Sequence, residues 1–571
     1  VKMNHDAIDA GAKAIVEVPV PAEWADAETE SLFVEAKGDN KPLVDYINNV
    51  QNYVNGQEGN ALKVSDLVPY VDGHMPLGAS AYEKRGVAVD VPSWNPDNCI
   101  QCNFCAYVCP HATIRPVAMT EEEAKAAPAA TKTADMTGMP GYKFAMTVTV
   151  LDCLGCGSCV NICPGKKGEK ALTMQGLDSQ RDQQEVYDYG QKLPAKEEVL
   201  AKFKADSVKG SQFRQPMLEF SGACAGCGET PYAKLITQLF GERMYIANAT
   251  GCSSIWGGSA PATPYTTNAK GQGPAWANSL FEDNAEFGLG MFTGQNTLRE
   301  QTKEKVVALA ESTDNADVKA AAAEYLDTYT DGSKNGAATD KLVAALEACG
   351  CDAAKEILAK KEFLSKKSQW IFGGDGWAYD IGFGGVDHVL ASGEDVNVFV
   401  FDTEVYSNTG GQASKSTNLG AIAQFQAAGK GTKKKDLAAI AMSYGYVYVA
   451  QIAMGADYNQ TVKAIAEAEA YPCINHGIKG GMKIAQTEEK KAVTSGYWNL
   501  FRFNPTLAAE GKNPFHLDSK APTTEYEDFI MGEVRYNALS RQNPERAKAL
   551  FAEAKANAEA KYNRLKEMSD K

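Results

Sequence analysis

Eight of the chain's 14 cysteines stand in two runs that share one pattern. The first run, "CIQCNFCAYVCP", covers 99–110, and the second, "CLGCGSCVNICP", covers 153–164. In each run two, two and three residues separate the cysteines, and a proline follows the last one. Thiolates are strong metal ligands, and short spacings let several of them in one loop face a common centre. The runs therefore predict metal ligation, and their repetition predicts two linked centres.

This pattern is typical of bacterial ferredoxins with two cubane clusters, in which the fourth cysteine of each run serves the other cluster. We assign one [4Fe–4S] cluster to Cys99, Cys102, Cys105 and Cys163, and the second to Cys153, Cys156, Cys159 and Cys109. A structural zinc site is the alternative, because paired C-x2-C is also typical of zinc. Zinc sites do not usually need three cysteines in such steps plus a C-P pair, twice over. The runs thus predict a pair of clusters that relays electrons.

A second candidate site lies in the glycine-rich turns "FGGDGWAYD" and "FDTEVYSNTGG", each of which follows an apolar segment. The pattern predicts a βαβ unit, and ligands of parallel sheets bind at the carboxyl ends of the strands. Asp375 offers a hard oxygen to Mg²⁺, and Thr403 with the carbonyl of Val405 can complete the oxygen shell. The flanking glycines let backbone N–H groups approach a diphosphate. The alternative is a glycine-rich turn without a site.

Six cysteines belong to neither run, and two of them, Cys349 and Cys351 in "EACGCDA", are interpreted as incidental. Cys224 and Cys227 lie in "CAGCGE", Cys252 in "NATGCSS" and Cys473 in "YPCINHG". Together they can cage one more cluster, whereas the alternative is buried apolar cysteine, which is common.

The turns resemble the GDG-to-Asn fingerprint of thiamine-diphosphate enzymes, with Thr403 where those enzymes usually carry Asn. Together with "CAGCGETPY", "NATGCSSIWGG" and "CINHG", they resemble the single-chain, three-cluster pyruvate:ferredoxin (flavodoxin) oxidoreductases over most of the chain. The resemblance implies a third cluster on Cys224, Cys227, Cys252 and Cys473. It implies catalytic roles for Glu229 and Asn408. The cofactor contacts that we expect are Glu229, Cys252, Gly374, Asp375, Gly376, Trp377, Thr403, Glu404, Val405, Tyr406, Ser407 and Asn408.

The activity that this resemblance implies is oxidative decarboxylation of pyruvate to acetyl-CoA and CO2, with single electrons passing through three clusters to ferredoxin or flavodoxin. Two alternatives stay open: another 2-oxoacid, such as 2-oxoglutarate or an aryl pyruvate, and a pure electron-transfer subunit. The resemblance covers the carboxy-terminal half of the family and implies a homodimer. The residues that activate the cofactor and hold the substrate carboxylate are then expected on another segment or chain. An apolar strand of the family is missing before Cys473, and we favour residues absent from the sequence.

These sites need an α/β fold: a thiamine-diphosphate-binding parallel-sheet domain, a fused α+β two-cluster ferredoxin domain and a helical C-terminal arm. The segments that we expect are a linker or support segment over 1–85, the ferredoxin-like domain over 86–185, a connector over 186–215, the thiamine-diphosphate domain over 216–500 with a helical insertion at about 296–367, and the arm over 501–571. The alternating stretch 141–150 predicts a strand.

The net charge of −15 and the pI of about 5.1 make nucleic acid an unexpected partner, because phosphate binding needs a basic surface. No apolar run is long enough for a bilayer, so no membrane contact is expected. Clustered cysteines without a signal segment favour the reducing cytoplasm. The basic stretch "GKKGEK" over 165–170 is either a solvated loop or a docking patch for an acidic electron carrier.

Overall fold

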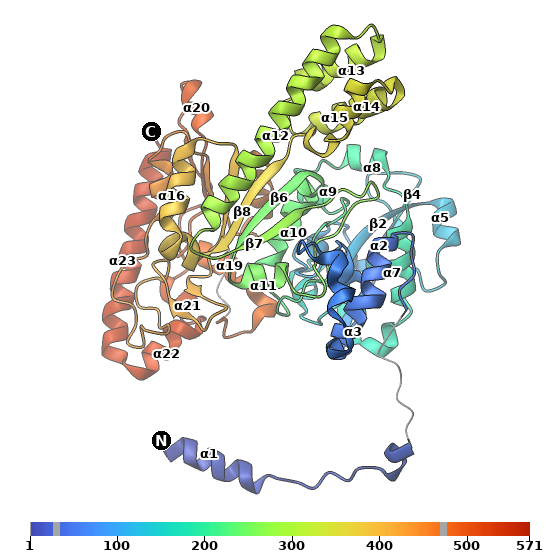
Figure 1. Cartoon of the computed structure of the whole chain (residues 1–571). Coiled ribbons are helices and arrows are strands. Elements are labelled where there is room, and N and C mark those ends of the chain that lie inside the picture. The colour runs from blue at the N-terminus through green and yellow to red at the C-terminus, as the bar shows by residue number, and fades with distance from the viewer. Residues whose placement is uncertain (1, 27–34, 469–476) are drawn as a thin grey trace. The chain divides into compact units, whose positions relative to one another are not determined.

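The computed structural model describes residues 2–26, 35–468 and 477–571 (Figure 1). Residue contacts divide the chain into two compact units, Val1–His74 and Met75–Lys571. The α-helices of the first unit are α1 (Lys2–Lys13), α2 (Lys41–Tyr46) and α3 (Asn52–Asn55). None of the helices in the described ranges is both long and apolar enough to span a membrane.

The two cysteine runs lie in a small α+β region of the second unit. Strand β1 (Asp90–Trp94) pairs antiparallel with β5 (Leu172–Gly176), and a second antiparallel sheet has the order β2-β4-β3. The bounds of that sheet are β2 (Ile114–Thr120), β3 (Ala134–Asp135) and β4 (Tyr142–Val148). The predicted strand over 141–150 is thus confirmed. Short helices α4 (Phe104–Tyr107) and α6 (Ser158–Ile162) lie within the cysteine runs.

A four-stranded parallel sheet forms the centre of the second unit, in the order β7-β6-β8-β9 (Figure 1). Its strands are β6 (Met244–Ala249), β7 (Ala275–Ser279), β8 (Ser368–Gly374) and β9 (Val396–Phe401). Helix α16 (Phe383–Ser392) connects β8 to β9, so the predicted βαβ unit is confirmed. Aromatic side chains of β8 and β9, among them Trp370 and Phe399, are fully buried and pack against one another.

Helices surround these sheets. Those before and beside the parallel sheet are α5 (Glu121–Ala126), α7 (Gln183–Lys192), α8 (Glu197–Lys202), α9 (Val208–Ser211), α10 (Thr230–Phe240) and α11 (Cys252–Gly257). Four more helices lie between β7 and β8 in the sequence and share an apolar cluster of their own. They are α12 (Asn284–Ser312), α13 (Ala316–Asp327), α14 (Asn335–Cys349) and α15 (Asp352–Leu358). This is where the sequence predicts a helical insertion.

The last part of the chain contains α17 (Leu437–Met442), α18 (Tyr458–Ala468), α19 (Ala485–Thr494), α20 (Pro505–Ala509), α21 (Tyr526–Ile530), α22 (Val534–Gln542) and α23 (Pro544–Ser569). Two small sheets accompany them: β10 (Val405–Tyr406) with β11 (Gln412–Ala413), and β12 (Val449–Gln451), β13 (Phe501–Phe503) and β14 (Phe515–Leu517). The long helix α23 buries Phe551 and Leu565, so one of its faces belongs to the core.

Candidate functional site

The structure brings the first predicted cysteine set together. Cys99, Cys102, Cys105 and Cys163 line one recess at the surface of this region. Apolar side chains, including Trp94, form much of the remaining wall. Gln101 and Asn103 have positive φ angles of 58° and 63°, which produce the tight turns between the thiols. Because the fourth thiol comes from the second run, the predicted exchange of ligands between runs has the required geometry.

The second predicted set also converges. Burial raises the pKa of Cys159 well above its ordinary value, and the neighbouring thiolates of Cys109, Cys156 and Cys153 raise it further. The Cys105 thiolate of the first set acts on Cys159 as well, so the two sets adjoin. Within residues 2–26, 35–468 and 477–571, no three His, Cys, Asp or Glu side chains are close enough to hold a single metal ion.

Three of the four remaining predicted cysteines lie at the edge of the parallel sheet. Cys252 begins α11, directly after β6, and burial raises its pKa. The charges that raise this pKa further belong to Glu229, Cys227, Cys224 and Asp375, so all of these groups lie near the Cys252 thiol. Cys473 falls outside the described residues, as does the place of the missing strand. Cys224, Cys227 and Cys252 therefore lie together near Asp375.

Glu229 is a buried carboxyl immediately before α10. Its side chain is 2% exposed and accepts a 2.8 Å hydrogen bond from the Trp256 indole N–H. Burial raises the pKa of Glu229 to about 7, which the indole hydrogen bond opposes. The carboxyl can therefore gain or lose a proton near neutral pH.

Oxygen atoms of Asp375, Thr403 and Val405 form a compact triangle at the carboxyl ends of β8 and β9. The Thr403 hydroxyl lies 3.0 Å from Asp375 Oδ1 and 3.0 Å from the Val405 carbonyl oxygen. A hydroxyl has one proton and cannot donate it to both acceptors. Ser414, which the sequence analysis missed, donates to the other Asp375 oxygen at 2.5 Å. Asp375 Oδ1 also accepts from the Thr403 backbone N–H at 3.2 Å, so a carboxylate, a hydroxyl and a carbonyl oxygen lie together at this edge of the sheet.

Electrostatics also favour a cation at this triangle. Asp375 is fully buried, and burial raises its pKa to about 8, with the nearby Asp402 carboxylate adding to the rise. Lys434 pairs with Asp402 at 2.7 Å, but among the described residues no cationic side chain forms an ion pair with Asp375, so its buried carboxylate needs a further positive partner. The chemistry of the donor set, a carboxylate, a hydroxyl and a carbonyl, is that of a hard divalent cation.

The glycines of the turn have distinct roles. A Cβ atom on Gly376 would lie 2.3 Å from the Tyr406 ring, whereas one on Gly374 would meet only the Phe401 carbonyl at 3.9 Å. Gly376 is therefore needed for packing, and the surface at Gly374 is open. Trp377 is buried in the apolar cluster behind the turn. Ser407 donates to the Thr403 hydroxyl at 2.7 Å, and Asn408 is exposed.

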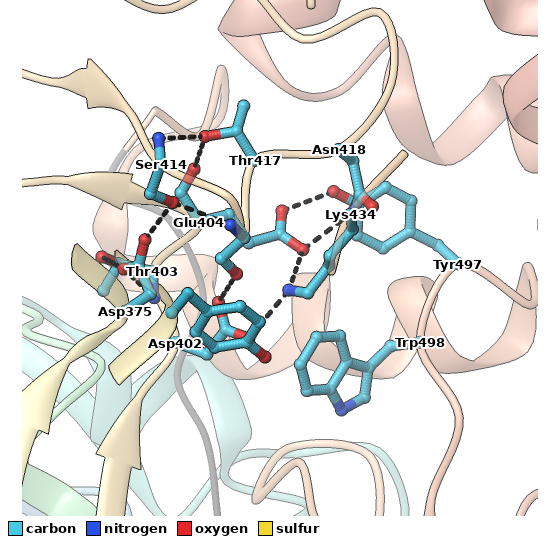
Figure 2. A network of polar contacts seen from close by, with 12 residues as sticks. Asp375, Asp402, Thr403, Glu404, Ser414, Thr417, Asn418, Lys434, Tyr497 and Trp498 are labelled. Carbon is cyan, nitrogen blue, oxygen red and sulfur yellow. Dashed lines mark hydrogen bonds and ion pairs between the residues drawn. The ribbon is translucent and has the colours of Figure 1, made fainter. Parts of the chain in front are cut away.

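A buried polar network surrounds Glu404, which lies between Thr403 and Val405 in the second glycine-rich turn (Figure 2). Glu404 has a φ of +63°, and its carboxylate is 2.8 Å from the Arg535 guanidinium and 3.0 Å from Lys434 Nζ. Tyr497 and Asn418 donate to it at 2.5 and 2.9 Å. These partners come from distant segments without a shared spacing, so no sequence pattern pointed to them.

Three family profiles match parts of the chain. They are a domain of unknown function named EKR over 35–88, a 4Fe–4S dicluster domain over 98–167, and the C-terminal TPP-binding domain of thiamine pyrophosphate enzymes over 343–475. The dicluster match covers both cysteine runs, and the thiamine pyrophosphate match covers the oxygen triangle. Binding of two [4Fe–4S] clusters and of thiamine diphosphate is thereby confirmed.

Similar proteins match over the whole of this chain. A pyruvate-flavodoxin oxidoreductase of Klebsiella pneumoniae is 50% identical, and a pyruvate:ferredoxin oxidoreductase of Moorella thermoacetica is 51% identical, each over 100% of this chain and 49% of its own length. A mitochondrial pyruvate dehydrogenase [NADP(+)] of Euglena gracilis is 44% identical over 100% of this chain and 32% of its own length. The chain spans about half the length of the first two relatives. Over its whole length the chain therefore corresponds to about half of a pyruvate:ferredoxin or pyruvate-flavodoxin oxidoreductase, and it has a 4Fe–4S dicluster domain and a thiamine-diphosphate-binding domain.

Proposed function

We propose that the chain is the thiamine-diphosphate and electron-relay part of an enzyme that oxidatively decarboxylates pyruvate to acetyl-CoA and CO2. The observation that carries the proposal is the position of the Cys252 thiol, which lies near both Asp375 and the thiols of Cys224 and Cys227. When bound, thiamine diphosphate supplies an electron sink for the decarboxylation of a 2-oxoacid. A thiol-rich edge beside that cofactor gives the electrons a way out toward the dicluster domain.

The oxygen triangle fits Mg²⁺. At Mg–O distances of 2.0–2.1 Å, neighbouring octahedral ligands lie about 3 Å apart, which is the distance of the Thr403 hydroxyl from Asp375 Oδ1 and from the Val405 carbonyl oxygen. Ser414 holds the second oxygen of Asp375, and the first oxygen would bind the ion. The open surface at Gly374 lets backbone groups approach a diphosphate, which would complete the shell.

We also propose a third [4Fe–4S] cluster on Cys224, Cys227, Cys252 and Cys473. Support comes from the mutual proximity of the first three thiols, since Cys473 lies outside the described residues. Glu229, next to these thiols, holds or releases a proton at its carboxyl, and Asn408 lies on the exposed turn where substrate would enter. The electron acceptor is ferredoxin or flavodoxin, coenzyme A takes the acetyl group, and the assembly is a homodimer that includes the family's other half. The domain bounds given by the sequence analysis are part of this proposal.

The test is pyruvate-dependent reduction of a low-potential dye by the assembled enzyme, with coenzyme A, Mg²⁺ and thiamine diphosphate present. Pyruvate is compared with 2-oxoglutarate and aryl pyruvates. Fastest reduction with pyruvate supports the proposal, and fastest reduction with another 2-oxoacid replaces the substrate. If no 2-oxoacid reduces the dye while dithionite-reduced clusters still pass electrons to it, the chain is an electron-transfer subunit and the proposal fails.

A further inference from the structure

Lys234 is a buried lysine on α10, seven positions after Cys227 in the sequence. Its side chain is 1% exposed. The ammonium group donates to the carbonyl oxygens of Tyr107 at 3.0 Å and Cys109 at 3.1 Å, and to that of Ala106. Three acceptors use three N–H donors, and only the protonated amine has three. The geometry therefore requires a buried positive charge.

The three carbonyls mark the point where the first cysteine run crosses from one cluster to the other. They lie at the end of α4, between Cys105, which is assigned to the first cluster, and Cys109, which is assigned to the second. Tyr107 and Val108 of this segment pack in the same apolar cluster as Tyr232 and Leu235 of α10. Lys234 thus brings a charge from the thiamine-diphosphate domain to the junction of the two ferredoxin-type clusters.

No carboxylate among the described residues forms an ion pair with Lys234, although buried charges normally have a partner of opposite sign. The other buried cation of this junction, Arg115, is paired with Glu219. The negative groups that act on Lys234 are instead the thiolates of Cys109 and Cys105. A cluster with four thiolate ligands is an anion, and it gains one further negative charge on reduction. A fixed cation nearby therefore stabilises the reduced form more than the oxidised form.

We propose that Lys234 is a positioning residue for charge, which raises the reduction potentials of the two ferredoxin-type clusters. The larger effect falls on the cluster assigned to Cys153, Cys156, Cys159 and Cys109, whose Cys109 carbonyl accepts a Lys234 hydrogen bond directly. The inference rests on that ligand assignment, which is part of the proposed function. Its functional consequence is that electrons leaving the thiamine-diphosphate domain meet a relay that accepts them more readily.

The experiment is a redox titration of the anaerobically purified, cluster-loaded chain, followed by electron paramagnetic resonance of the reduced clusters. Lys234→Met and Lys234→Gln remove the charge, and Lys234→Arg keeps it. Lys430→Met is the matched control, because Lys430 is also buried and donates to two backbone carbonyls, at 2.8 and 2.6 Å. The charged side chains that act on Lys430 are carboxylates and Lys434, and not cysteines of the clusters. We expect both neutral variants to shift at least one midpoint potential to a more negative value, and Lys234→Arg and Lys430→Met to keep the parental values.

Parental midpoint potentials in a cluster-loaded Lys234→Met or Lys234→Gln protein would overturn the proposal. If both neutral variants fail to take up clusters, Lys234→Arg decides: cluster uptake by this variant supports a need for the buried charge, and failure there too assigns Lys234 a role of shape alone. The potentials are measured without pyruvate or thiamine diphosphate. A missing pyruvate activity therefore rejects the proposed function without bearing on Lys234, and unchanged potentials reject the role of Lys234 without bearing on the activity.

Discussion

Replacing Arg535 with Met should weaken the binding of thiamine diphosphate and Mg²⁺, although Arg535 lies on α22 and not among the oxygen donors. The reason is Glu404, which stands between the donors Thr403 and Val405 in a left-handed backbone conformation with φ +63°. Such a conformation costs of order 1–3 kcal/mol in a residue with a side chain. The structure offsets this cost by holding the buried Glu404 carboxylate with Arg535 and with Lys434 and Tyr497, the last two labelled in Figure 2.

The magnitude follows from the burial of the pair. Both the Arg535 and Glu404 side chains are nearly inaccessible, at 6% and 5% exposed. Removing one partner of such a buried pair costs about 3–5 kcal/mol. Because Lys434 and Tyr497 still hold the carboxylate, we expect the lower end, about 3 kcal/mol, divided between folding and binding. If most of it falls on the turn that carries Thr403, Glu404 and Val405, cofactor affinity drops about a hundredfold.

The assay is an equilibrium titration of thiamine diphosphate at saturating Mg²⁺, followed by tryptophan fluorescence, since Trp377 lies two residues after Asp375 in the first glycine-rich turn. Arg564→Met is the matched control: Arg564 is an arginine of α23 paired with Asp436 at 2.7 Å, but its side chain is 54% exposed. Exposed pairs contribute about 0–1 kcal/mol, so this variant should bind almost as the parent does. A parental dissociation constant in Arg535→Met, together with a lowered melting temperature, would refute a role for the network in shaping the turn that carries Thr403, Glu404 and Val405.

Three further outcomes follow from the same structure. Asp375→Asn should weaken Mg²⁺-dependent binding of thiamine diphosphate at least about a hundredfold, through loss of a charged contact worth about 3 kcal/mol; calorimetric titration checks this, and parental affinity would remove Asp375 from the site. Reversing the charge of the basic loop after the second cysteine run should slow reduction of ferredoxin at low salt but much less at high salt; equal rates for variant and parent at low salt would leave a solvated loop. The residues to reverse are Lys166, Lys167 and Lys170. Burial raises the pKa of Glu489 from 4.5 to about 7, so the folded protein binds this proton more tightly than the unfolded chain does. The protonated Glu489 stabilises the fold fully below about pH 4.5, and this stabilisation of about 3 kcal/mol is lost as the pH rises through 7. Glu489→Gln should remove this pH dependence from melting curves between pH 5 and 8. An unaltered pH dependence in the variant would contradict the raised pKa of Glu489.

The cysteine sets were predictable because local spacing dictates them. Three thiols at intervals of two residues must share a loop, and the repetition of the run predicts that the fourth thiol of each set comes from the other run. The proximity of Asp375 and Thr403 was predictable for a related reason, since parallel strands joined by one helix place their carboxyl ends at the same edge. In both cases the pattern is short and the geometry follows from the chain itself.

The supports of the site were not predictable in this way. Ser414 contacts Asp375, and Lys434 and Arg535 contact Glu404. These side chains come from loops and from α22, and only the tertiary fold brings them to the two turns. Lys234 resembles any polar residue of an amphipathic helix until the structure shows its ammonium group among three carbonyls. The partners of buried charges depend on packing between distant segments, which composition and periodicity do not encode.

The most direct measurement of the central claim is a joint count of iron, acid-labile sulfide and thiamine diphosphate in one anaerobically purified preparation. We expect iron and sulfide for three [4Fe–4S] clusters and one thiamine diphosphate per chain. In Cys252→Ser, we expect iron and sulfide to fall by one cluster while the two ferredoxin-type clusters keep their spectra. Iron for only two clusters in the parent, or a Cys252→Ser protein with undiminished iron, would contradict a cluster beside the thiamine-diphosphate site.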